Sequence, residues 1–434
     1  MYTRYHDPEI FVQTLDGIDR SNHIVATYLM DDELPGEEFM DHFALIQSVA
    51  VEGSTGTWEK VAEETEEVRR RLSGKMVGYY EIPTNNASRK SAVVQLAFPI
   101  DAWIDNVPMM LLSIAGNCFA YSPKMRLLDV FIPDDLLAKF KGPKFGVPGI
   151  RKALNVPDRP LSLHIIKPKM GMTPKQVGDQ CYQTALGGVD MMKDDEMTSD
   201  LYNSNYEDRL KAVLEAQEKA EAKTGKRTIY FVSITDEPRR IFEKAARAVE
   251  SGARGLLVCY SAGLPVIRQL AEDPAINVPI LAHMDLAGAY FMSPYQGISS
   301  PIIFGKISRL CGADAIVLPF SLGGKAMYMH DRFMSTTRNL TYPFGNLKPT
   351  MPMPSGGITP ANVPDIVNTL GKDIMIGSGG GIHAHPKGPR AGARALRQAI
   401  DAAVKGIKLE EYAKEHEELG IALGVWGKKT DFKI

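Results

Sequence analysis

The sequence predicts an α/β protein with a (β/α)8 TIM barrel at residues 144–434 and a smaller α+β domain at residues 1–143. Three observations predict the barrel. From residue 145 onward, short β-rich runs alternate with helix-like segments, and there are eight such runs. Their interiors are almost entirely apolar, as parallel strands that are buried on both faces require. We therefore expect a closed parallel barrel.

Each predicted barrel strand ends in Gly, Pro or polar residues, and a helical segment such as "PRRIFEKAARAVESG" follows. The strands span residues 161–168, 189–194, 228–235, 255–260, 279–285, 313–320, 348–356 and 374–380. The structural alternative is an open doubly wound sheet, which would need a GxGxxG turn after its first strand. The segment "KPKMGM" at that position is not such a turn, so the closed barrel is preferred.

The first 140 residues have a different pattern. Strands are predicted at residues 23–32, 75–83, 91–100 and 125–133, and helices at residues 36–52 and 65–72. This order fits a small α+β domain of the ferredoxin-like kind ahead of the barrel. The Gly- and Pro-rich stretch at residues 136–150 is the expected junction.

Composition excludes several classes of protein. With 434 residues, of which 44% are hydrophobic, the chain can bury a large core. A net charge of −2 gives no electrostatic reason to expect binding to nucleic acid or to an anionic membrane. The sequence shows no apolar signal region and no apolar stretch long enough to span a bilayer, so we expect a cytoplasmic protein. The four cysteines are far apart in the sequence, which favours reduced thiols and argues against structural zinc.

Polar residues follow the C-terminal ends of the predicted strands. Active sites of such barrels lie at these ends. These residues are Lys167 and Lys169 (first strand), Lys193, Asp195 and Glu196 (second), His283 (fifth), Lys325 (sixth), Ser355, Gly356 and Gly357 (seventh), and Ser378, Gly379, Gly380 and Gly381 (eighth). The glycine turns after the last two strands are where barrels commonly hold a phosphate with backbone N–H groups. We therefore expect one phosphate there.

Lys193 lies next to three carboxylates, at residues 194–196. Strand alternation places Lys193 and Asp195 on one face, with Glu196 just beyond the strand end. Two carboxylates at a barrel mouth suit Mg²⁺, but an ammonium group would repel the ion. Lys193 is then either a Schiff-base amine with a depressed pKa, or a carbamate formed with CO₂ that supplies oxygen ligands. The residues alone leave both interpretations open.

Several motifs together resemble one family. They are "IIKPKMGMT" (165–173), "GGVDMMKDDE" (187–196), "EGSTGTW" (52–58), "IAGNCF" (114–119), "PSGGI" (354–358) and "GSGGGIHAHP" (377–386). The chain resembles the RuBisCO large subunit over nearly its whole length, and more closely the RuBisCO-like proteins that share its fold without fixing CO₂.

This resemblance implies roles for individual residues. It implies that carbamylated Lys193 binds Mg²⁺ together with Asp195 and Glu196. Lys167 would transfer the proton, with Lys169 as its neighbour. From their places at strand ends, we also expect His283 and Lys325 to be catalytic residues. The two glycine turns would bind the substrate phosphate. The resemblance also implies a homodimer or an assembly of dimers with shared active sites. In it, the N-terminal residues Glu52, Thr57, Trp58 and Asn117 would complete the active site of the partner subunit.

The departures from RuBisCO are informative. RuBisCO has an arginine for its second phosphate after the strand-five histidine, whereas Met284 follows His283 here. The sixth strand lacks the histidines that RuBisCO has near its end. A second phosphate dianion against Met284 and Val317 would be buried without compensation, at high cost. We therefore expect a substrate with one phosphate, and expect neither ribulose bisphosphate nor CO₂ fixation.

The family chemistry is formation of an enediolate from a phosphorylated keto compound with the help of Mg²⁺. The preferred interpretation is a decarboxylase or transcarboxylase of the 3-oxo-isoapionate 4-phosphate type, with Lys325 near a carboxylate of the substrate. The alternatives are the 2,3-diketo-5-methylthiopentyl-1-phosphate enolase and the 5-methylthioribulose-1-phosphate isomerase of methionine salvage. Against the enolase, Asn117 stands where that enzyme uses a lysine, and the "GGK" at 323–325 has no match there. A non-catalytic sugar-phosphate-binding protein is the alternative from another class, and the complete Lys-Asp-Asp-Glu set argues against it.

Overall fold

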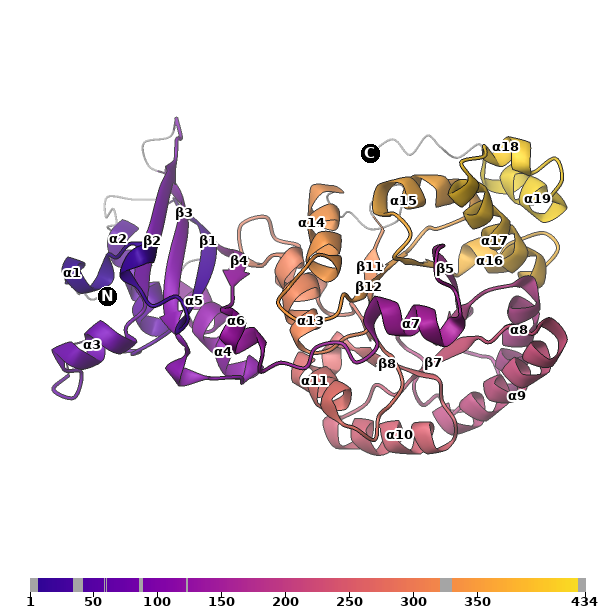
Figure 1. The fold of residues 1–434 in the computed structure, drawn as a ribbon, viewed down its shortest axis with the longest axis horizontal. Coiled ribbons are helices and arrows are strands. Elements are labelled where there is room, and N and C mark those ends of the chain that lie inside the picture. Colours follow the sequence, from indigo (N-terminus) through magenta and orange to yellow (C-terminus); the bar gives the residue numbers. More distant parts are fainter. Residues whose placement is uncertain are drawn as a thin grey trace. The chain divides into compact units, whose positions relative to one another are not determined.

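The protein is represented by a computed structural model (Figure 1), which describes residues 7–33, 42–57, 59, 61–85, 89–121, 124–320 and 330–427. The chain divides into two compact units. The first consists of Met1–Phe140 and Ala287–Ile307, and the second of Lys141–Leu286 and Ser308–Ile434. The segment Ala287–Ile307 follows a barrel strand in the sequence but belongs to the first unit, which the sequence pattern did not indicate.

The first unit contains a mixed sheet with the strand order β10-β4-β1-β3-β2. Its strands are β1 (His23–Glu33), β2 (Lys75–Ile82), β3 (Arg89–Pro99), β4 (Met125–Phe131) and β10 (Gly297–Ile298). The β1–β3, β1–β4 and β2–β3 pairs are antiparallel, whereas β10 pairs with β4 in parallel. The order of β1 to β4 is that of a ferredoxin-like fold, so the predicted α+β domain is confirmed.

The helices of this unit pack on the sheet because its strands alternate in polarity. In β1, residues Ile24, Ala26, Tyr28 and Met30 are fully buried, as a period of two predicts for one face. The Tyr28 hydroxyl donates a hydrogen bond to the Ile114 carbonyl in α4, at 2.7 Å. The helices are α1 (Pro8–Phe11), η1 (Leu15–Gly17), α2 (His42–Glu52), α3 (Glu66–Leu72), η2 (Ile100–Ala102), α4 (Val107–Ala115), α5 (Cys118–Tyr121), α6 (Asp134–Leu137), α12 (Gly288–Phe291) and the π-helical η4 (Pro301–Ile307).

The second unit is a closed parallel barrel with the strand order β11-β12-β13-β5-β6-β7-β8-β9. The strands are β5 (Leu161–Ile165), β6 (Met191–Lys193), β7 (Ile229–Ser233), β8 (Gly255–Cys259), β9 (Ile280–His283), β11 (Ala315–Pro319), β12 (Met351–Ser355) and β13 (Met375–Ser378). Each lies inside one of the eight predicted runs. The predicted (β/α)8 barrel is confirmed.

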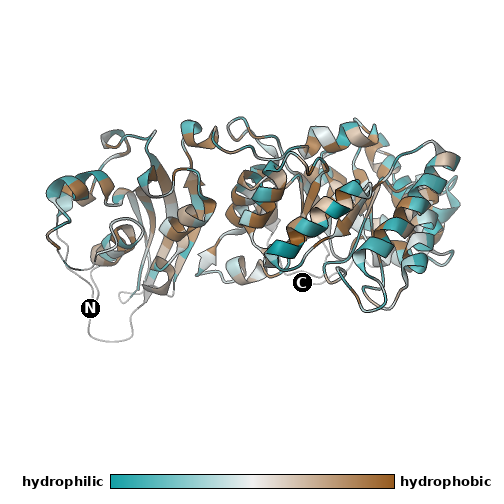
Figure 2. Cartoon of the chain, turned by 90° about the horizontal axis from the view of Figure 1, so that it is seen from below, coloured by the Kyte–Doolittle hydropathy of each residue, from teal (hydrophilic) through white to brown (hydrophobic). Residues whose placement is uncertain are grey.

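Helices surround the barrel, and Figure 2 shows largely apolar strands inside helices that carry polar residues on their outer faces. Local sequence explains their ends. Helix α8 begins at a capping box between Thr173 and Gln176 and ends at Gly188, whose φ of 97° suits glycine. The helices are α7 (Gly146–Leu154), α8 (Pro174–Gly187), α9 (Tyr206–Thr224), α10 (Pro238–Glu250), η3 (Tyr260–Ala262), α11 (Leu264–Glu272), α13 (Ser308–Leu310), α14 (His330–Thr341), η5 (Pro360–Asn362), α15 (Val363–Leu370), α16 (Gly380–His383), α17 (Pro389–Lys405), α18 (Leu409–Tyr412) and α19 (Glu417–Trp426).

The barrel interior is apolar at one end and polar at the other. Leu163, Met191 and Phe231 belong to its buried core, and Val147, Ile150 and Leu154 of α7 pack against the same core. Helix α7 directly precedes β5, and its Val147 N–H donates to the carbonyl of Pro349, just ahead of β12. It therefore covers the N-terminal ends of the strands, which leaves the C-terminal ends for polar side chains. Across the described residues, no helix is both long enough and apolar enough to cross a membrane.

Candidate active site

Lys193 is the last residue of β6 and is only 1% exposed. Its Nζ donates a hydrogen bond to the Asp194 carbonyl at 2.8 Å. Burial lowers the pKa of Lys193, while the nearby charges of Asp195 and Glu196 act in the opposite direction. The Lys193 amine, which was predicted to lie at the barrel mouth, is therefore buried. A positive charge is costly at such a position.

Two lysines from the β5 end and one histidine from the β9 end face Asp195 and Glu196. Lys167 forms an ion pair with Asp195, and Lys169 forms ion pairs with Glu196 and, at 3.1 Å, with Asp195. His283 Nε2 lies 3.6 Å from Glu196 Oε2. Burial acts to raise the pKa of Asp195, but its hydrogen bonds with Glu196 and Lys167 outweigh burial and hold the pKa well below its ordinary value. The structure thus brings together five of the residues predicted from three strand ends.

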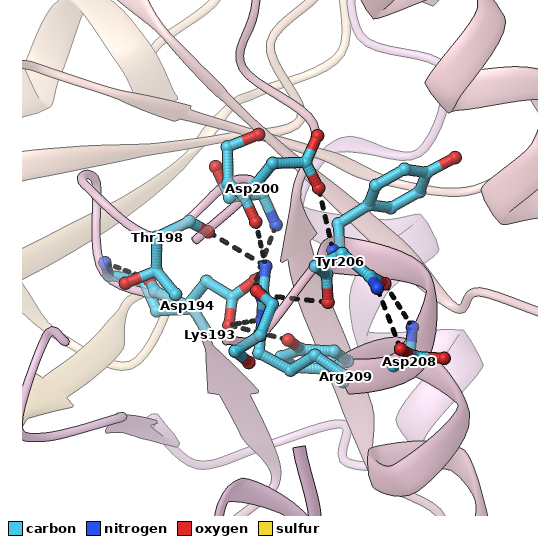
Figure 3. A network of polar contacts seen from close by, with 12 residues as sticks. Lys193, Asp194, Thr198, Asp200, Tyr206, Asp208 and Arg209 are labelled. Carbon is cyan, nitrogen blue, oxygen red and sulfur yellow. Dashed lines mark hydrogen bonds and ion pairs between the residues drawn. The ribbon is translucent and has the colours of Figure 1, made fainter. Parts of the chain in front are cut away.

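Asp194 points away from this cluster into the fully buried ion pair drawn in Figure 3. Arg209 of α9 donates to both carboxylate oxygens of Asp194, with distances of 3.0 and 3.1 Å from Nε and 3.0 Å from Nη2. The Tyr230 hydroxyl, at 2.6 Å, and the Ser233 N–H, at 2.9 Å, complete its hydrogen bonds. Arg209 Nη2 also donates to the carbonyls of Thr198 and Ser199, so one arginine holds both Asp194 and the loop that follows Glu196.

Cys259 and Asp285 lie next to His283, and sequence reasoning did not select either of them. The Asp285 N–H donates to His283 Nδ1 at 3.3 Å, and Asp285 Oδ1 lies 3.7 Å from the same nitrogen. Burial lowers the pKa of His283 and raises that of the Cys259 thiol to about 12. Both missed residues stand in predicted strand runs, "GLLVCY" and "PILAHMD", so their place at strand ends was the available signal.

The predicted phosphate turns lie side by side after β12 and β13. Ser355 pairs with Gly377, and Ser378 Oγ donates to the Ile358 carbonyl at 2.8 Å. Gly356 has a φ of 93°, and a Cβ added at Gly356 or at Gly380 would meet nothing within 4 Å. Open space therefore adjoins the backbone of both turns, as an anion held by N–H groups would need.

Lys167 connects these turns with the carboxylates. A Cβ added at Gly379 would come within 3.3 Å of two carbons of the Lys167 side chain. A Cβ added at Gly381 would come within 2.3 Å of the Ile358 carbonyl oxygen, so glycine is required there by the close approach of the two turns. The lysine thus lies between the β13 turn and Asp195.

The predicted N-terminal residues belong to the first unit. Asn117 Nδ2 donates to Glu52 Oε1 at 3.0 Å, so these two residues are in contact. Thr57 donates its hydroxyl to the carbonyl of Glu59. Trp58 and Lys325 lie outside the described residues. The role of these residues in a site shared between subunits stays a prediction.

The donors around Lys193 fit Mg²⁺ under one condition. Asp195 and Glu196 offer hard oxygen ligands, and Asp195 Oδ1 makes no hydrogen bond of good geometry although Lys169 lies nearby. The buried amine of Lys193 fits beside such an ion only as a neutral or oxygen-bearing group. A carbamate at this position would complete a set of oxygen ligands.

Comparisons with known proteins give the same family as the motifs. Residues 14–136 match the N-terminal domain, and residues 146–426 the catalytic domain, of the ribulose bisphosphate carboxylase large chain. The chain belongs to this family, whose members generally use Mg²⁺ and a carbamylated lysine.

Within the family, the chain is similar to RuBisCO-like proteins. It is 44% identical to the ribulose bisphosphate carboxylase-like protein of Archaeoglobus fulgidus, over 96% of both chains. It is 36% identical to the 2,3-diketo-5-methylthiopentyl-1-phosphate enolase of Geobacillus thermodenitrificans, over 93% of this chain and 98% of that protein. The crystal structure of a rubisco-like protein (MtnW) from Alicyclobacillus acidocaldarius superposes with a TM-score of 0.86 at 34% identity, over 94% of this chain and 100% of the other.

Proposed function

We propose that this protein is a Mg²⁺-dependent enzyme that enolises a monophosphorylated keto compound by removing the proton next to its carbonyl group. The observation that carries the proposal is the convergence of Lys167, Asp195 and Glu196 around the buried Lys193 at the barrel mouth. Strongly perturbed ionisable groups gathered at the C-terminal end of such a barrel are typical of active sites.

Lys193, as its carbamate, would hold the metal together with Asp195 and Glu196. When bound there, Mg²⁺ supplies a Lewis acid that polarises the substrate carbonyl and offsets the developing negative charge. Arg209 acts indirectly, because its ion pair with Asp194 fixes the backbone between the metal-binding residues. We expect this pair to help hold the orientation of Lys193 and Asp195, which flank Asp194 in the sequence.

Lys167 is the residue to which we assign the proton transfer. Its Nζ contacts Asp195, and its side chain adjoins the β13 turn, so the lysine lies between the metal-binding and the phosphate-binding parts of the proposed site. A base must come within hydrogen-bond reach of the proton that it takes. A substrate phosphate held at Gly379–Gly381 would place its adjacent carbons within that reach.

The proposed substrate carries one phosphate because only one end of the site suits a dianion. The turns at Gly356–Gly357 and Gly379–Gly381 offer backbone N–H groups beside open space. Met284 packs against the apolar barrel core and Val317 is 1% exposed within that core, so neither supplies a charge or a hydrogen bond. A second phosphate against them would lose its hydration without replacement.

We prefer enolisation to decarboxylation because the similar proteins include a named enolase. A protein named as an enolase is similar to this chain over nearly its whole length, as is the solved MtnW structure. The decarboxylase of the 3-oxo-isoapionate 4-phosphate type stays the second candidate, because Asn117 replaces the lysine of the salvage enolase and instead binds Glu52. In that second reaction, we propose that Lys325 lies near a carboxylate of the substrate.

A substrate panel tests the proposal. Turnover of 2,3-diketo-5-methylthiopentyl-1-phosphate, 3-oxo-isoapionate 4-phosphate and ribulose 1,5-bisphosphate is measured with Mg²⁺ and bicarbonate, while CO₂ release is followed. We expect turnover of a monophosphate, its loss in Lys167→Ala, and its retention in Lys175→Ala, a matched change at a largely exposed lysine.

The outcomes separate the candidates. Turnover accompanied by CO₂ release would replace the enolase with the decarboxylase. Carboxylation of ribulose bisphosphate would contradict the single-phosphate argument. Binding of the monophosphates without any turnover would identify a non-catalytic sugar-phosphate-binding protein.

A further inference from the structure

Cys259, His283 and Asp285 form a second group of metal-binding side chains, distinct in chemistry from the Lys193 set. One donor atom from each lies within 4.8 Å of the donor atoms of the other two. Cys259 and His283 end the adjacent parallel strands β8 and β9 and are direct register partners. The barrel itself therefore fixes two of the three groups next to each other.

Asp285 is held in place by the backbone of the neighbouring strand end. Its Oδ1 accepts the Tyr260 N–H at 3.0 Å, and its Oδ2 accepts the Ser261 N–H at 3.4 Å. The carboxylate is thus oriented before any ligand arrives. The Cys259 thiol also hydrogen-bonds to this carboxylate, so the two side chains are already in contact. Loss of the thiol proton would free both groups to bind one ion.

The spacing between His283 and Asp285 is compatible with a shared cation. The Asp285 N–H makes a long hydrogen bond of 3.3 Å to His283 Nδ1, and Asp285 Oδ1 lies 3.7 Å from the same nitrogen. Because an imidazole nitrogen has one lone pair, an ion on Nδ1 would replace this N–H contact. The distance of 3.7 Å is too long for a hydrogen bond. Two ligands bonded to one tetrahedral ion at about 2.1 Å stand roughly 3.4 Å apart, which is close to the observed separation.

We propose that Cys259, His283 and Asp285 bind one transition-metal ion of the Zn²⁺ class. A thiolate, an imidazole and a carboxylate together favour Zn²⁺, Co²⁺ or Fe²⁺, whereas Mg²⁺ prefers oxygen ligands alone. On binding, the thiol proton leaves to solvent and a metal–sulfur bond forms, with no change of oxidation state. Three protein ligands leave one position open, as in catalytic rather than structural sites.

The position of the ion connects it to the proposed active site. His283 presents Nδ1 to Asp285 and Nε2 to Glu196, the latter at 3.6 Å. An ion on Nδ1 fixes the orientation of the ring, and it strengthens the Nε2–H as a donor toward Glu196 or a substrate oxygen. This inference holds whichever reaction the enzyme performs, because the site is defined by its own ligands.

Cobalt binding tests the site directly. The full-length protein is stripped with a chelator, reduced, and titrated with Co²⁺ in the presence of excess Mg²⁺, while absorbance is recorded. We expect about one equivalent of Co²⁺ to bind with a thiolate-to-cobalt charge-transfer band in the near ultraviolet. The band is expected to disappear in Cys259→Ala and in Asp285→Asn. Each change should weaken Co²⁺ binding by at least the roughly tenfold to hundredfold loss caused by removing an outer-shell partner.

Two control variants locate the ion. Cys181→Ala removes another fully buried thiol, on α8, and should leave the band unchanged. Lys193→Ala disables the proposed Mg²⁺ site and should also leave it unchanged. Circular dichroism confirms that each variant is folded, and Asp285→Asn serves if Cys259→Ala does not fold. Bound Co²⁺ without a thiolate band, a band that persists in Cys259→Ala, or displacement of Co²⁺ by Mg²⁺ would each overturn the proposal.

Discussion

Replacing Arg209 with methionine tests the support of the proposed metal site. The Arg209 and Asp194 side chains are both fully buried, and three N–H···O contacts of 3.0–3.1 Å join them. Arg209 also donates to the Ser204 carbonyl at 2.8 Å and to the Thr198 carbonyl at 3.0 Å. Methionine keeps much of the side-chain volume but none of these donors.

The expected loss of stability is large because one charge stays buried without its partner. Breaking a buried ion pair by removing one member costs about 3–5 kcal/mol. For a unit of this size, 1 kcal/mol corresponds to a change in Tm of roughly 2–4 °C, so the transition of the barrel unit should fall by roughly 6–20 °C. The affinity for Mg²⁺ should fall too, since Asp194 lies between Lys193 and Asp195.

The assay is thermal and urea unfolding of the wild type and three variants. The control is Arg239→Met, because Arg239 is 93% exposed and pairs only with Glu243 on the same helix among the described residues. This control should change stability by less than about 0.5 kcal/mol. The double variant Asp194→Asn/Arg209→Met should recover part of the loss, since no unpaired charge is then buried. A cost below about 1 kcal/mol for Arg209→Met would refute the reasoning.

Three further predictions concern the site and its surroundings. Preincubation with bicarbonate and Mg²⁺ should raise activity and Lys193→Ala should abolish it, whereas full activity in CO₂-free buffer would exclude the carbamate. Mixing inactive Glu52→Gln and Lys193→Ala chains should restore some activity, because one site of each mixed dimer is intact; no recovery in proven heterodimers would argue against a shared site. Burial and the neighbouring His383 lower the pKa of His164, so below the ordinary histidine pKa of about 6.5 the unfolded chain binds a proton that the folded chain does not. Unfolding experiments should therefore show stability falling with decreasing pH, by up to about 1.4 kcal/mol per pH unit from this residue, and an unchanged slope in His164→Gln would contradict this.

The sequence alone was enough to predict the barrel because its strands are short apolar runs that end in glycine, proline or polar residues. Each of the eight runs contains a strand. Lys193 is buried at the end of β6 and the charge of Asp195 acts on it, although the strand ends before Asp195. The family followed from spaced motifs. The roles assigned to individual site residues stay predictions, including those of Trp58 and Lys325 outside the described residues.

The directions in which the site side chains point, and the residues with which they pair, depended on the tertiary structure. The run "KDDE" does not reveal that Asp194 turns outward to Arg209, which is 15 residues away in the sequence, while Asp195 meets the lysines that follow β5. Helix α9 brings that arginine to the strand end. The different roles of neighbouring carboxylates thus come from partners supplied by other elements.

The grouping of Cys259, His283 and Asp285 also could not be predicted from the local sequence. The sequence showed four scattered cysteines without metal-binding spacing and a histidine at a strand end. Only the parallel register of β8 and β9 sets Cys259 against His283, and only the turn after β9 brings Asp285 back to the backbone of Tyr260. Local sequence determines which residues form strands and where the strands end, because that depends on hydrophobic pattern and turn chemistry. Which ends meet depends on barrel closure, in which hydrogen bonds join residues far apart in the chain.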